Sequence, residues 1–110
     1  MRMFQEIKQR WTSHTSLPEI AGEVADQCLE AVWQRVQHQV STLSTAEARG
    51  YIRARGVAVV QPRLASASTE HDVLEQLRPQ LYFLTVEAVI GRVQDRLREH
   101  ARDSRWRHAA

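Results

Sequence analysis

Residues 16–47, SLPEIAGEVADQCLEAVWQRVQHQVSTLSTAE, contain two clear helix starts. Ser16 and Ser44 are each followed three positions later by a glutamate. This is the capping-box pattern, in which the serine accepts from a first-turn amide and the glutamate reaches back. Pro18 lies in the first turn, where its missing N–H is harmless. The stretch predicts a long helix over about 17–43 and a second helix that folds back on it as an αα-hairpin.

The first of these helices has an amphipathic pattern. Its apolar residues recur at helical spacing and form one stripe, namely Leu17, Ile20, Ala21, Val24, Cys28, Val32, Val36 and Leu43. An acidic stripe lies on the opposite side, formed by Glu19, Glu23, Asp26 and Glu30. The next helix is expected over about 45–61, with many small residues, and Pro62 is expected to end or kink it.

The second half of the chain predicts another long helical segment. Residues 65–69 are expected to form a loop, with Ser68 or Thr69 as the following N-cap. An apolar stripe then continues over about 70–104, interrupted by Pro79. The proline predicts either a kink near residues 76–78 or two helices, 70–78 and 79–104.

A short amphipathic helix is also expected over residues 2–12. The sequence therefore predicts an all-α fold and a single domain over 1–110. The expected architecture is an antiparallel helical bundle of four to five helices with two long ones, about 17–43 and 70–104, the latter kinked near Pro79.

Composition excludes several classes of protein. Of the 110 residues, 43% are hydrophobic, which suffices for one core, and no apolar run approaches the ~18 residues of a spanning helix. The N-terminal residues do not resemble a secretory signal. Cys28 is the single cysteine, so packing alone must hold the fold. We expect a cytoplasmic protein with no membrane partner.

The sequence has no arrangement of residues typical of a catalytic or metal site. A di-iron bundle would need Glu-x-x-His pairs, a thiolate zinc site more than one cysteine, and nucleotide binding a glycine-rich loop; none is present. Cys28 lies on an apolar stripe, where a cysteine is typically a small core residue. The prediction is therefore no catalytic residues, no metal and no cofactor, and the protein is more typical of a non-enzyme.

The large apolar side chains present more apolar surface than one thin core needs. Phe4, Trp11, Trp33 and Phe83 are the candidate interface residues. Exposed apolar surface marks contacts with other molecules, and two-fold pairing is the commonest way to cover it. A wider monomeric core is the alternative interpretation. The leading hypothesis is a non-catalytic helical interaction module, an adaptor, regulator or assembly factor, that pairs with itself or another protein.

Two basic groups carry the alternative hypotheses. Arg98, Arg102, Arg105 and Trp106 form a basic and aromatic surface that could contact nucleic acid. It could also be a solvated face favourable to the helix dipole, or meet the acidic stripe within one chain or across a subunit contact. The second group, Tyr51, Arg53 and Arg55, lies between Gly50 and Gly56 and is a candidate anion or small-ligand site.

Overall fold

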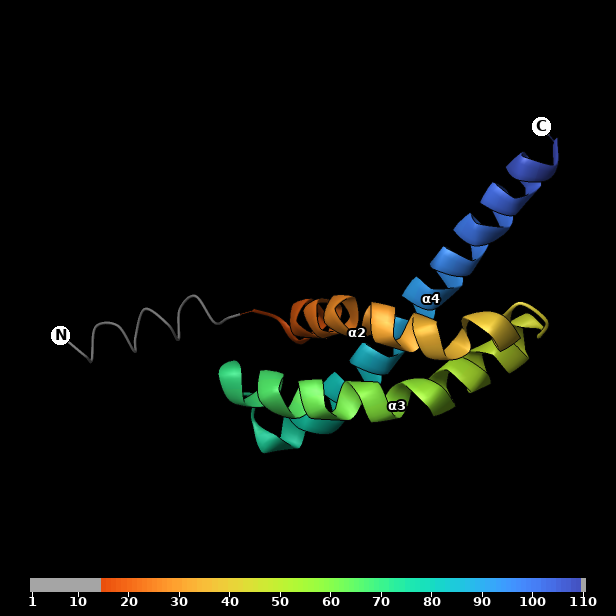
Figure 1. Cartoon of the computed structure of the whole chain (residues 1–110). Coiled ribbons are helices and arrows are strands. Elements are labelled where there is room, and N and C mark those ends of the chain that lie inside the picture. The colour runs from red at the N-terminus through yellow and green to blue at the C-terminus, as the bar shows by residue number, and fades with distance from the viewer. Residues whose placement is uncertain (1–14, 110) are drawn as a thin grey trace.

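The computed structural model describes residues 15–109, and their side chains as far as Ser104. This part of the chain is helical, with no strand. Its elements are α2 (Leu17–Val40), α3 (Thr45–Glu70), the short 3₁₀ turn η1 (Glu75–Leu77) and α4 (Arg78–Ala109) (Figure 1). The helix expected over residues 2–12, with Phe4 and Trp11, lies outside the described residues.

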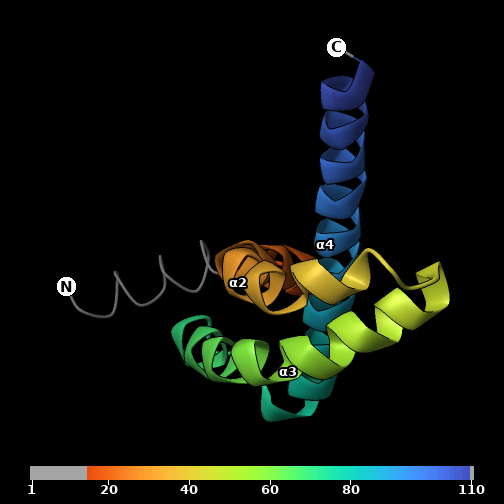
Figure 2. The same ribbon diagram turned by 45° about the vertical axis from the view of Figure 1, so that its right-hand side comes forward.

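Both predicted serine N-caps are confirmed. The Ser16 hydroxyl accepts from the Glu19 amide at 3.3 Å, but the Glu19 carboxylate does not bond back to the Ser16 amide, so the full capping box predicted there does not form. At Ser44 the capping box is reciprocal, because the hydroxyl accepts from the Glu47 amide at 3.3 Å and the Glu47 carboxylate accepts from the Ser44 amide at 3.1 Å. These bonds satisfy amides that would otherwise lack a partner in the first turn. The predicted αα-hairpin is present, since α2 and α3 run side by side in opposite directions (Figures 1 and 2).

The expected count of four to five helices is wrong for the described residues, which form three α-helices and one 3₁₀ turn. The expected break at Pro62 does not occur, and α3 runs to Glu70. Pro62 and Ala58, whose carbonyl the missing N–H would have bonded, both lie on the exposed side of α3. Water can satisfy that carbonyl there, so the helix continues, gently curved, through the proline (Figure 2).

The loop predicted at 65–69 is helical, and the chain turns at 71–74 instead. The end of α3 is a Schellman motif: the Val73 amide donates to the Ser68 carbonyl at 2.8 Å and the Asp72 amide to the Thr69 carbonyl at 3.2 Å. Asp72 has φ 51°, the left-handed conformation that this motif requires. The last long helix therefore starts at Arg78, close to the alternative start at residue 79 and not at residue 70. Pro79 lies in its first turn, where no kink results.

The core lies between the three helices. Buried side chains from α2 include Val24, Val32 and Val36, and those from α4 include Leu81, Ile90 and Val93. Gly56 of α3 lies where all three meet: a Cβ built there would lie 3.7 Å from Val32 and 3.9 Å from Val89. These are ordinary van der Waals distances, so a methyl group at position 56 would contact both neighbours without displacing them.

The helices do not form the simple antiparallel bundle that the sequence predicts. α4 crosses the α2–α3 hairpin steeply and its C-terminal half projects beyond it (Figures 1 and 2). Val93 is the last fully buried residue of α4, Leu97 is half-buried, and residues 98–104 are exposed. We call the segment from Leu97 to Ala109 the α4 projection.

Candidate interaction surface

The acidic stripe of α2 is used within the chain. Asp26 pairs with Arg92 of α4 at 2.8 Å, and Glu30 pairs with Arg96 at 2.5 Å. The hydrogen bond from Arg96 lowers the pKa of the Glu30 carboxyl, with a smaller contribution from Gln34. The stripe therefore meets Arg92 and Arg96, which precede Arg98, the first residue of the basic group that the sequence singled out, by six and two positions. Exposed ion pairs stabilise little, so these two accompany the packing of α4 on α2.

Trp33 is placed in the core, with 6% of its surface exposed. The Arg96 guanidinium lies 5.7 Å from the centre of its ring, and the His100 ring meets it edge-on at 5.8 Å. The pattern of α2 alone could not show this, because the residues that cover Trp33 come from α4. Of the candidate interface residues with described side chains, Phe83 remains at the surface, 56% exposed.

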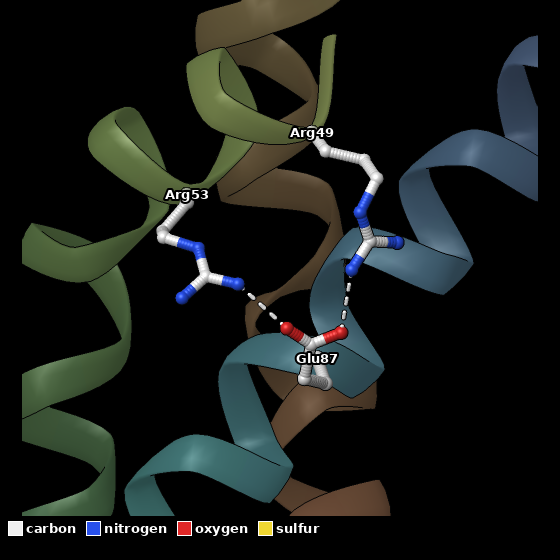
Figure 3. A network of polar contacts seen from close by, with 3 residues as sticks. All are labelled: Arg49, Arg53 and Glu87. Carbon is white, nitrogen blue, oxygen red and sulfur yellow. Dashed lines mark hydrogen bonds and ion pairs between the residues drawn. The ribbon is translucent and has the colours of Figure 1, made fainter. Parts of the chain in front are cut away.

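A second polar cluster joins α3 to α4. Glu87 of α4 accepts from Arg49 at 2.7 Å and from Arg53 at 2.6 Å, one guanidinium to each carboxylate oxygen (Figure 3). The three side chains are 30–48% exposed, so water screens the pairs. Glu87 was not among the residues singled out in the sequence. No sequence spacing connects it to arginines more than thirty positions earlier.

The candidate ligand residues Tyr51, Arg53 and Arg55 do not converge on one point. Arg53 binds Glu87, whereas the Arg55 guanidinium lies 5.4 Å from the centre of the Tyr51 ring. Gly50 faces open space and Gly56 faces the core. The sequence suggested a ligand site here because these residues are close together in the chain. In the structure their side chains have separate partners and do not form one site.

The basic group on α4 lies on the projection. Arg98 pairs with Asp95 at 2.6 Å on the same helix, and Arg102 is exposed. The side chains of Arg105 and Trp106 lie outside the described part. Two described arginines, one of them neutralised, make a weaker anion site than the sequence suggested.

A groove lies at the base of the α4 projection. It is lined by Ser41, where α2 ends, and by Leu97, Arg98, His100, Ala101 and Ser104 of α4. Leu97 and Ala101 follow Val89 and Val93 at four-residue spacing. The apolar face of α4 that is buried among the three helices therefore continues into the α4 projection. Leu97 still packs partly against the core, whereas Ala101 is exposed.

The opposite end of α4 exposes apolar surface beside acidic side chains. Leu74, just before η1, is 59% exposed, and Phe83 lies on the second turn of α4. Glu70, Asp72 and Glu75 are exposed in the same part of the chain. We call residues 70–77 the acidic connector. A shallow pocket nearby is lined by Gln61, Leu64, Ala65, Ser68, Arg78, Leu81 and Tyr82.

The described residues hold no group of three or more His, Cys, Asp or Glu side chains that could bind a metal ion. Cys28 is buried in the core, and burial raises the pKa of its thiol, partly offset by Arg63. A thiol that stays protonated is a poor nucleophile.

Within residues 15–109, no helix has the length and apolar content needed to cross a membrane. The cytoplasmic location stays a prediction. Comparisons with protein-family models, with curated proteins and with solved structures found no match.

Proposed function

We propose that this protein is a helical interaction module that pairs with a second copy through the exposed surface of α4. The observation that carries the proposal is the continuation of the α4 apolar stripe from Leu97, which packs partly against the core, to Ala101, which is exposed. A helix face of this kind gains stability when a partner covers it. Two-fold pairing is the commonest arrangement among soluble oligomers.

The polar composition of the projection suits a contact that forms between folded molecules. Arg98, His100 and Ser104 line the groove beside the apolar Leu97 and Ala101. Interfaces commonly have such an apolar centre with a polar rim, in which charges set orientation more than affinity. The protein would act by bringing two copies together, without chemistry of its own.

Light scattering at tens of micromolar tests the proposal. The wild type should have twice the monomer mass of 12.7 kDa. Ala101→Glu places a charge in the groove and should weaken the dimer by about tenfold or more, as expected for a buried unpaired charge. Ala54→Glu, on the exposed side of α3, is the matched control and should leave the dimer unchanged.

Three results would overturn the proposal. One is a wild type that is monomeric throughout. Another is an equal effect of the two glutamate substitutions. The third is a monomer that binds nucleic acid with steep salt dependence, lost on changing Arg98 and Arg102 to alanine, which would favour the alternative derived from the basic group.

A further inference from the structure

We infer that the two copies pair in a reciprocal, antiparallel manner, with the α4 projection of each molecule lying against the acidic connector and the start of α4 of the other. This inference rests on the proposed function and specifies which surfaces meet. It draws on two features at opposite ends of α4, one of charge and one of apolar exposure.

The first feature is charge. Residues 70–78 carry Glu70, Asp72 and Glu75 against the single arginine Arg78, with His71 counted as neutral. Residues 98–109 carry four arginines, at 98, 102, 105 and 107, against Glu99 and Asp103. The two ends of α4 thus have opposite net charge. No described ion pair involves Glu70, Asp72, Glu75 or Arg102, whereas the acids along the middle of α2 already have partners.

The second feature is apolar exposure. The two large hydrophobic side chains most exposed in the described part are Leu74, on the acidic connector, and Phe83, near the start of α4. Leu97 and Ala101 line the groove near its other end. Each end therefore has an apolar area, with a net negative charge over residues 70–78 and a net positive charge over residues 98–109.

These ends cannot meet within one molecule. Arg102 lies about 36 Å along α4 from Arg78, at roughly 1.5 Å per residue, and the helix is straight and unbroken between them (Figure 2). A parallel pairing of two α4 helices would put like charges together, which is unfavourable. An antiparallel two-fold pairing puts each basic end beside an acidic one, and its symmetry makes every such contact twice.

Charge reversal with rescue tests this arrangement. Glu75→Arg and Arg102→Glu should each weaken the dimer by about tenfold, because each change replaces two attractions with two repulsions. Combining them in one chain restores opposite charges at both contacts. The double variant should therefore return to within about threefold of the wild-type dissociation constant. Arg55→Glu makes the same change of charge on α3 and should have no effect.

Sedimentation of the five proteins separates the inference from the proposed function on which it rests. If the wild type dimerises but the double variant is as weak as the single variants, the antiparallel arrangement is wrong and self-association stands. If the wild type is a monomer, both fall. All three positions are exposed, so circular dichroism should show an unchanged helical fold in every variant.

Discussion

Asp72 is the residue at which α3 stops, and its side chain is not the best for that position. Its φ of 51° is costly for residues with a Cβ and free of strain for glycine. Asp72→Gly should therefore raise the free energy of unfolding by about 0.5–1 kcal/mol, measured by urea denaturation. Ser66→Gly, within α3 on its exposed side, should instead lower it by a similar amount, about 0.5–1 kcal/mol. If both substitutions destabilise, the Schellman end of α3 is misplaced.

Glu30 predicts a dependence of stability on pH. The bond from Arg96 lowers the pKa of Glu30 below its ordinary 4.5, so the folded state favours the ionised carboxylate. The resulting stabilisation is complete above the unfolded-state pKa and is lost as the pH falls through the lower, folded-state pKa. Thermal melting of wild type and Glu30→Gln should thus differ most near neutral pH and converge in acid. A constant difference from pH 7 to well below 4.5 would contradict the pairing with Arg96.

Individual residues also show which features of the structure could be predicted from the sequence and which could not. The Ser16 and Ser44 caps were predictable because a cap depends on residues within three positions. The burial of Trp33 and the pairing of Glu87 were not, because both depend on contacts between residues more than thirty positions apart. Phe83 was identified as a candidate surface residue, and the structure leaves it exposed.

At the scale of elements, Pro62 tests why α3 continues past residue 61. Because the proline is on the exposed side, it costs α3 one hydrogen bond but no core contact. Pro62→Ala restores the donor and should stabilise the protein by up to about 3 kcal/mol, reduced by the greater freedom of the unfolded chain. Urea denaturation measures the difference, and hydrogen exchange should slow around residues 58–66. A destabilised variant would mean that the proline ring makes a contact of its own.

Helical periodicity predicted the class of fold and the α2–α3 hairpin, but not the boundaries in the second half. Residues 65–69 are small and polar, which favours a loop locally, whereas Ala67 and Ser68 are buried in the folded chain. Tertiary burial outweighs the weak local preference and moves the turn to residues 71–74. That shift also removes the expected helix over 70–78 and leaves Leu74, Glu75 and their neighbours on the connector surface.

For the whole molecule, we predict two copies joined through opposite ends of α4. The sequence suggested self-pairing from a surplus of large apolar residues. The structure adds the distinction between the covered part of α4 and its projection, on which the proposed contact rests. It also removes Trp33 from the candidate surface, because α4 covers that ring within the same chain.

Disulfide cross-linking of a chain carrying both Glu75→Cys and Arg102→Cys is the most direct measurement. Positions 75 and 102 are too far apart along one α4 to join within a molecule, and buried Cys28 has a raised thiol pKa that keeps it out of the reaction. After oxidation of mixed ¹⁵N-labelled and unlabelled protein, we expect peptides that join position 75 of one copy to position 102 of another. Predominant 75–75 or 102–102 links, or no covalent dimer, would contradict the account.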